Sequence, residues 1–161
     1  MVWGSICDYS RSDLIILQRD MSSKKQGCTT SSYIAALDLG LLSIWQPDRT
    51  YQQNKDPIHI ANKTKKYFEE IELRLLSNWP PYSPDLNPIE HLWVLLQQKL
   101  YELYPDCETW LGSNETIHER MEDALVHAWG EIDSQLIYNL CASMPRRIQA
   151  VIDSEGWYTR Y

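Results

Sequence analysis

The sequence predicts an α/β fold with helices packed on a sheet, and three observations lead to this class. Short runs with strand character, near the N-terminus and at residues 50–53 and 72–76, alternate with segments of helical periodicity. From residue 88 onward the periodicity is helical throughout. The chain has 161 residues, 43% of them hydrophobic, which is enough for one domain with a substantial core.

An antiparallel hairpin is the first expected element. Residues 2–7 and 13–17 are short β-rich apolar runs, and the residues between them favour a turn. Asp8, Asp13 and Asp20 lie on or beside this hairpin. A turn or a solvated surface explains these three acids more simply than metal binding.

The middle of the chain predicts two helices and two strands. Residues 29–32 are rich in Ser and Thr and can cap a helix over residues 33–45, although Gly40 weakens that helix. A strand at residues 50–53 is expected to lead to a helix over residues 60–70, and residues 72–76 alternate as in a further strand. The lysines of the second helix are expected to form a solvated face.

A proline-rich stretch, residues 78–93 (NWPPYSPDLNPIEHLW), forms the centre of the sequence. Its prolines stiffen the segment in front of a helix for which Asn87 is the expected N-cap and Pro88 the first residue. The apolar residues along one face of this helix are Ile89, Leu92, Trp93, Leu96, Leu100 and Leu103. Glu90 therefore lies in the first turn.

Glu90 has two explanations. Asn87 and Glu90 have the spacing of a variant capping box, in which the acid also complements the helix dipole. Alternatively, the stiff loop and the helix N-terminus hold one carboxylate in the fixed orientation that a divalent metal site for phosphoryl transfer needs. Spacing alone favours the cap.

The C-terminal part predicts three amphipathic helices. Their apolar stripes are Ile117, Met121, Ala124, Leu125 and Ala128, then Leu136, Ile137, Leu140 and Cys141, then Ile148, Val151 and Ile152, with a helix end at Gly156. Trp110, Trp129 and Trp157 are expected to pack between helices. Arg146 and Arg147 can contact DNA, but their helical setting favours pairing with nearby acids.

Composition limits the possible functions. A net charge of −7 and a pI near 5.0 argue against strong sequence-independent DNA binding, which needs lysine and arginine to neutralise phosphates. The four cysteines have no zinc-like spacing and are expected to be reduced thiols. With no apolar run of membrane-spanning length and no signal-peptide pattern, the sequence predicts a soluble intracellular protein with no membrane partner.

Residues 79–90 (WPPYSPDLNPIE) resemble the third catalytic motif of the mariner-type transposases of the DDE superfamily. Residues 1–6 (MVWGSI) are similar to a strand motif of these enzymes, and residues 143–148 and 156–161 resemble the C-terminal segment of fungal-type members. The resemblance implies an RNase H-like mixed α/β sheet flanked by helices. It also implies a nuclease whose two aspartates and one glutamate hold Mg²⁺ or Mn²⁺, and which cleaves transposon ends and transfers strands into target DNA.

The second motif departs from the family. Residues 53–59 are QNKDPIH where the family has QDNAPxH, so Asn54 stands at the position of the second catalytic aspartate. An amide brings no negative charge, and the change should weaken metal binding. Asp56 would lie about 6.6 Å further along a strand, although the spacing to Glu90 fits either residue. His59 is either the histidine of the family motif or a local hydrogen-bonding residue.

These departures define our expectation for the chain. The resemblance places the first catalytic aspartate on a central strand upstream of residues 1–6, and that strand is not encoded here. We expect residues 1–161 to form a partial catalytic domain, α/β over about residues 1–105 and helical over residues 106–161. Glu90 and Asn54 would be what remains of the catalytic set, with Asp56 as an alternative metal ligand and the chain inactive in DNA cleavage.

The alternative is a non-catalytic remnant that binds nucleic acid or an intact transposase weakly and acts as a passive regulator. Its partners would then be DNA, a transposase or a second copy of itself, and its location the nucleus. A further idea is that residues 81–84 (PYSP) form a PxxP ligand. The helix that follows disfavours it by tying the segment into the fold.

Overall fold

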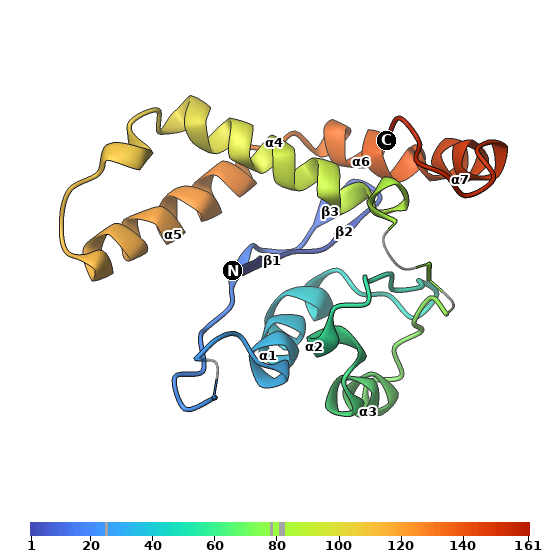
Figure 1. The fold of residues 1–161 in the computed structure, drawn as a ribbon, viewed down its shortest axis with the longest axis horizontal. Coiled ribbons are helices and arrows are strands. Elements are labelled where there is room, and N and C mark those ends of the chain that lie inside the picture. Colours follow the sequence, from blue (N-terminus) through green and yellow to red (C-terminus); the bar gives the residue numbers. More distant parts are fainter. Residues whose placement is uncertain (25, 78, 81–82) are drawn as a thin grey trace. The chain divides into compact units, whose positions relative to one another are not determined.

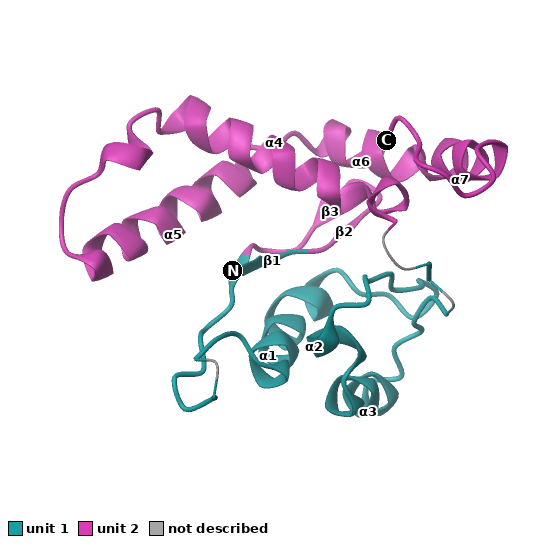
Figure 2. Cartoon of the chain, in the orientation of Figure 1, with its two compact units in different colours: residues 1–4, 15–82 teal, residues 5–14, 83–161 magenta. Residues whose placement is uncertain are grey.

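The computed structural model describes residues 1–24, 26–77, 79–80 and 83–161 (Figure 1). These residues divide into two compact units, coloured separately in Figure 2. Unit 1 comprises residues 1–4 and 15–82, and unit 2 comprises residues 5–14 and 83–161. Residues 81 and 82, on which the expected stiff connector and the PYSP ligand depend, lie outside the described residues.

The N-terminal hairpin is confirmed, and it contributes one antiparallel ladder to each unit. In unit 1, β1 (Val2–Trp3) pairs with β4 (Ile15–Ile16). In unit 2, β2 (Ile6–Cys7) pairs with β3 (Ser10–Arg11). Asp8 turns the chain between β2 and β3 with a φ of 56°, a left-handed conformation that aspartate tolerates better than most residues.

Unit 1 contains the expected helices with shifted ends. α1 (Thr30–Gly40) begins with a full capping box between Thr29 and Ser32 and continues as a 3₁₀ turn, η1 (Leu41–Ser43). The second predicted helix is present as α2 (Pro57–Ile60) and α3 (Asn62–Glu70).

The two strands expected at residues 50–53 and 72–76 are shorter in the structure than in the prediction. They form a single parallel bridge between Tyr51 and Leu75. The Tyr51 N–H donates to the Arg74 carbonyl at 2.7 Å, and the Leu76 N–H donates to the Tyr51 carbonyl at 2.8 Å. A parallel pair is less stable per residue than an antiparallel pair and gains length from further strands beside it. No further strand pairs with this one in the described part of unit 1.

The core of unit 1 forms where β1, α1 and α3 pack together. Its buried residues are Trp3, Leu17, Tyr33, Ala36, Leu37, Leu41, Phe68 and Leu73. Gly40 ends α1 directly against the Trp3 ring, because a Cβ at residue 40 would lie 2.2 Å from Trp3 Cζ3 and 3.2 Å from Ile15 Cγ1. This close approach explains a glycine in a helix that it would otherwise weaken.

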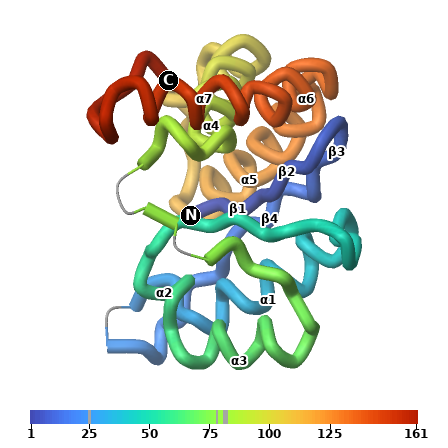
Figure 3. Tube along the Cα trace, turned by 90° about the vertical axis from the view of Figure 1, so that its right-hand side faces the viewer, coloured from blue at the N-terminus to red at the C-terminus, as the bar shows by residue number. Residues whose placement is uncertain are grey.

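Unit 2 is mainly helical, and its helices are labelled in Figure 3. The elements are η2 (Pro84–Leu86), α4 (Pro88–Leu103), η3 (Cys107–Thr109), α5 (Asn114–Gly130), α6 (Ser134–Ala142) and α7 (Met144–Asp153). Leu92, Leu96 and Leu100 of α4 are buried, as its apolar stripe predicts. Ser113 and Asp133 cap α5 and α6 by accepting from backbone N–H groups. No helix in the described chain is long and apolar enough to cross a membrane.

Tryptophan packing agrees with the sequence at two of three positions. Trp129 is buried, stacks on Trp93 with ring centroids 5.5 Å apart, and donates from Nε1 to the Ser12 carbonyl at 2.8 Å. Trp110 is buried as well. Trp157 is 73% exposed, so the expectation of core packing is wrong for this residue.

The face of α7 that turns inward also differs from the prediction. Ile148 and Ile152 are exposed, whereas Arg147 is only 2% exposed. Hydrogen bonds account for this reversal, since a buried guanidinium has many donors to satisfy. Helix α7 therefore presents its arginine side, and not its apolar stripe, to the rest of unit 2.

Arg147 joins three segments of unit 2. Its guanidinium donates from Nη1 to the Asp85 carbonyl and from Nε to Ser143 Oγ, each at 2.7 Å. Its Nη2 lies 3.3 Å from His91 Nδ1, which must accept because arginine only donates. The guanidinium also lies over the Tyr161 ring, 4.7 Å from its centroid. The expectation that Arg147 pairs with an acid is replaced by bonds to neutral acceptors.

Gly40→Ala should destabilise the protein by about 1–3 kcal/mol, because the added methyl group clashes with a buried tryptophan ring. The measurement is urea unfolding followed by circular dichroism. Gly130→Ala is the matched control, since a Cβ at this helical glycine meets nothing within 4 Å and should leave stability equal or slightly higher. Equal effects of the two changes would contradict the packing described for Gly40.

Arg147→Met should lower the free energy of unfolding by about 2–4 kcal/mol, because it leaves the Asp85 carbonyl and the Ser143 hydroxyl without their buried donor. Arg146→Met, at the exposed neighbouring position, should change it by less than about 0.5 kcal/mol. Thermal unfolding of the two variants checks this difference. A stable Arg147→Met variant would show that the buried bonds contribute little.

Candidate functional site

The segment around residue 54 belongs to unit 1. It follows the Tyr51 bridge and is an exposed turn, not the continuation of a strand. Asn54 is exposed, and its Oδ1 accepts the N–H of Asp56 at 3.1 Å. The residue at the aspartate position of the resemblance therefore stabilises a turn through its amide oxygen.

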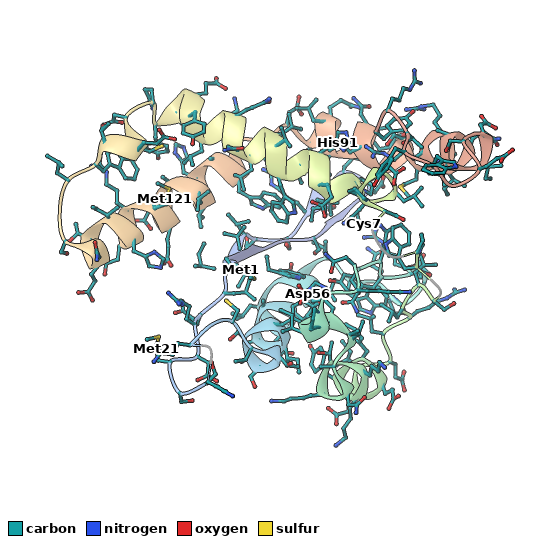
Figure 4. The ribbon with its side chains drawn as sticks, viewed as in Figure 1. Met1, Cys7, Met21, Asp56, His91 and Met121 are labelled. Carbon is teal, nitrogen blue, oxygen red and sulfur yellow. The ribbon has the colours of Figure 1, made fainter. Side chains whose placement is uncertain are left out.

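Asp56, labelled in Figure 4, is the N-cap of α2. Its Oδ1 accepts the N–H of Ile58 at 3.1 Å, and Pro57 takes the first helical position. Because residues 54–56 form a turn, the displacement expected for Asp56 along a strand does not apply. Both side chains already use one oxygen in local backbone bonds.

A buried polar network supports this turn from within unit 1. Tyr33 is 1% exposed, and its hydroxyl donates to Gln53 Oε1 at 2.5 Å. Gln53 Nε2 donates in turn to the His59 carbonyl at 3.2 Å. Burial strongly raises the pKa of Tyr33, so its hydroxyl remains a donor across the physiological pH range. The network fixes the residues on both sides of Asn54 and Asp56.

His59 packs against the same tyrosine. Its ring centroid lies 4.2 Å from that of Tyr33, and burial lowers the pKa of His59, so the imidazole is neutral at pH 7. Its Nδ1 is buried and has no hydrogen-bond partner within the described part of the chain. This ring contact is a packing role that neither of the two explanations from the sequence included, and the choice between the family motif and a local hydrogen-bonding residue stays a prediction.

Glu90 lies in the first turn of α4 in unit 2 and is half-buried. Its Oε1 accepts from Asn87 Nδ2 at 3.1 Å, and its N–H donates to the Asn87 carbonyl at 3.1 Å. The predicted capping box is therefore wrong: the Asn87 amide donates to the Glu90 carboxylate, and its side chain does not cap a backbone N–H of α4.

The loop before Glu90 is fixed at several points. Asp85 Oδ1 accepts the Leu86 N–H, Asp85 Oδ2 accepts the Thr159 hydroxyl, each at 3.1 Å, and the Asp85 carbonyl accepts from Arg147. His91, labelled in Figure 4, follows Glu90 and contacts Arg147. Burial and then the neighbouring guanidinium lower the pKa of His91, so this side chain is neutral at pH 7.

The donor set does not fit a complete divalent-metal site. Carboxylates neutralise closely spaced dications, whereas Asn54 offers one neutral oxygen that already accepts a hydrogen bond. Over the described ranges, no three His, Cys, Asp or Glu side chains gather as ligands of one ion. Asn54 and Asp56 are brought together in unit 1, and Glu90 is placed in unit 2.

Sequence reasoning missed the polar supports of these residues. Tyr33 reaches Gln53 across 20 positions, and Thr159 reaches Asp85 across 74. Contacts at such separations leave no periodic signal in a single sequence. Gln53 was visible as the first residue of the second motif, but its partner was not.

Comparisons with known proteins agree on one family. Residues 51–109 match the model of the DDE superfamily endonucleases. The chain is 39% identical over 111 residues to the Tc1 transposase of Caenorhabditis elegans. The matched region covers 69% of this chain and 37% of that protein. It is 29% identical over 161 residues to the Tc3 transposase of Caenorhabditis elegans, covering 97% of this chain and 44% of that protein. The chain thus spans less than half the length of these relatives.

A solved structure shows the same fold. The catalytic domain of the Mos1 mariner transposase matches 99% of this chain and 82% of that domain, with a TM-score of 0.60 and 15% sequence identity. The expected RNase H-like α/β fold with a helical C-terminal part is therefore confirmed, and over the described residues its incomplete sheet consists of two two-stranded antiparallel ladders and one parallel bridge. Taken with the motif at residues 79–90, these matches show that the chain belongs to the mariner-type transposases of the DDE superfamily.

Proposed function

We propose that this chain is a segment of a transposase nuclease domain that does not itself cleave DNA. The observation that carries the proposal is Asn54, which stands where the family motif has its second aspartate and whose side chain serves a turn. The relatives are named as transposases. For the ancestor of this chain we propose their chemistry, metal-dependent DNA cleavage followed by strand transfer.

Charge is the physical basis of the expected inactivity. A metal-assisted nuclease of this type needs carboxylates to hold and neutralise its divalent ions. Replacing one carboxylate with an amide removes a full negative charge from the ligand set. If Asp56 replaced the missing carboxylate as a metal ligand, it would have to turn away from the Ile58 N–H. This would remove an N-cap bond that stabilises α2 by about 1 kcal/mol.

The proposed function also includes the division of the partial domain, its metal ion and its location in the cell. We assign residues 1–105 as the α/β part and residues 106–161 as the helical tail of the partial domain. Glu90 is its remaining catalytic-type acid, and Mg²⁺ or Mn²⁺ the ion of its family. We place the chain with DNA in the nucleus.

A second function is favoured by exposed cations in unit 2. Arg146 and Arg160 are exposed, and they would allow weak contact with DNA. Such a chain, binding DNA or pairing with an intact transposase or a second copy of itself, would act as a passive regulator. An electrophoretic shift that weakens as salt rises would support this function, because phosphate contacts release counterions.

The proposed inactivity predicts no nicking of labelled duplex DNA in Mn²⁺, one of the two ions of the family. The reaction is followed on a denaturing gel over many hours. Glu90→Ala is the control for contaminating nucleases, which would nick DNA equally with either protein. Metal-dependent nicking that disappears in Glu90→Ala would contradict the proposed inactivity.

Asn54→Asp should tighten Mn²⁺ binding by roughly tenfold or more, since it restores one carboxylate to the ligand set. Titration followed by the electron paramagnetic resonance signal of free Mn²⁺ measures the affinity. Asp56→Asn in the wild-type background is the matched comparison, because it removes the other carboxylate of the same turn. If the wild type already binds Mn²⁺ tightly and Asp56→Asn abolishes that binding, then Asp56 replaces the lost aspartate.

A further inference from the structure

We propose that Arg146 and Arg160, at the C-terminal end of unit 2, form a contact site for backbone phosphates of a DNA strand, with Trp157 as a surface for one of its bases. This inference rests on the proposed function only in taking DNA as the ligand. It assigns a binding role to residues that the nuclease motifs do not include.

Three arginines gather around one tyrosine, although the chain as a whole is acidic. The guanidinium carbons of Arg147 and Arg160 lie 4.7 and 5.5 Å from the centroid of the Tyr161 ring. Arg160 and then Arg146 lower the pKa of Tyr161, as cations close to its hydroxyl would. The cluster therefore brings together side chains from α7 and from the C-terminal segment.

Among the described residues, no carboxylate forms an ion pair with Arg146 or Arg160. The ion pairs within the described chain are those of Lys66, Lys99, His118 and His127, and none includes Arg146, Arg147 or Arg160. Asp85 lies close to Arg147, but its two carboxylate oxygens accept from Leu86 and Thr159. The positive charge of Arg146 and Arg160 thus remains available at the surface.

Two features make this charge suited to a phosphodiester. The guanidinium group presents a planar fork of donors that matches phosphate oxygens. Arg146 also occupies the first turn of α7, where the helix dipole adds positive potential. The buried Arg147 stacks on the Tyr161 ring, so the cluster is held in place before a ligand arrives.

The exposed aromatic residues in the same segment favour a nucleic acid, and not an acidic protein, as the ligand of this cluster. Trp157 and Tyr158 are 73% and 91% exposed, which is unusual for side chains of this size. Gly156, with a φ of 83°, turns the chain after α7, and Ser154 holds the next residue by donating from Oγ to the Trp157 carbonyl at 2.8 Å. Aromatic rings beside arginines form the usual surface for a single strand, since every base has a face that can stack.

The site lies at the end of unit 2 that carries Glu90. Arg147 contacts both the Asp85 carbonyl before α4 and His91 beside Glu90. Its neighbour Arg146 and its stacking partner Tyr161 therefore belong to the same end of the unit. A strand bound by these arginines would pass close to the first turn of α4.

The test is fluorescence anisotropy of a labelled 20-nucleotide single strand at several salt concentrations. For the variant carrying Arg146→Gln and Arg160→Gln we expect roughly tenfold weaker binding and a salt slope reduced by about 1.4, because two phosphate contacts are lost from a single strand. Trp157→Ala should weaken binding about fivefold with an unchanged salt slope. All three substituted residues are exposed, and circular dichroism should confirm an unchanged fold.

The matched control carries Lys65→Gln and Lys66→Gln, which makes the same change in net charge on the exposed face of α3 in unit 1. The proposed site would be contradicted if both double variants lost the same DNA affinity or if the arginine variant lost none. It would also be contradicted if the wild type did not bind DNA at low salt. The nicking assay reports separately on catalytic activity. The binding site and the proposed inactivity can therefore fail independently.

Discussion

The buried guanidinium of Arg147 is the interaction on which the arrangement of unit 2 depends. A cation removed from water needs every donor satisfied, and this one finds a carbonyl, a hydroxyl, an imidazole and an aromatic face. Those partners belong to η2, to the residue between α6 and α7, to the first turns of α4 and to the C-terminal segment. One side chain thereby orders the segment that precedes Glu90 and reverses the face that α7 turns inward.

The residues of the nuclease motifs show how a chain can keep a motif while losing its chemistry. Asn54 and Asp56 accept backbone N–H groups at the start of α2, and Glu90 accepts from Asn87 at the start of α4. Turn and cap bonds need only an oxygen at the right distance, which an amide supplies as well as a carboxylate. Metal binding needs the negative charge in addition. An Asp-to-Asn change at residue 54 is therefore compatible with the local fold and costly for catalysis.

Much of the fold could be predicted because its signals are local. The helices follow apolar periodicity and cap residues such as Thr29 and Ser113, and the hairpin follows two β-rich runs around a turn. The strands at residues 50–53 and 72–76 were predicted too long, because strand length depends on neighbours elsewhere in the chain. Trp157 and Ile152 were predicted to be buried, but both are exposed. The local pattern identifies apolar residues, but it does not show which other part of the chain covers them.

The sequence by itself determined the family, through a motif of twelve consecutive residues, and the positions of Asn54, Asp56 and Glu90 within it. It also determined most helices, because caps and periodicity act over a few residues. Only the tertiary structure decided that Arg147 is buried, that Tyr33 and Gln53 support the turn at residue 54, and that Arg146 and Arg160 share an exposed corner with Tyr161. These facts depend on hydrogen bonds and ring contacts between residues far apart in the chain, whose partners no local pattern reveals.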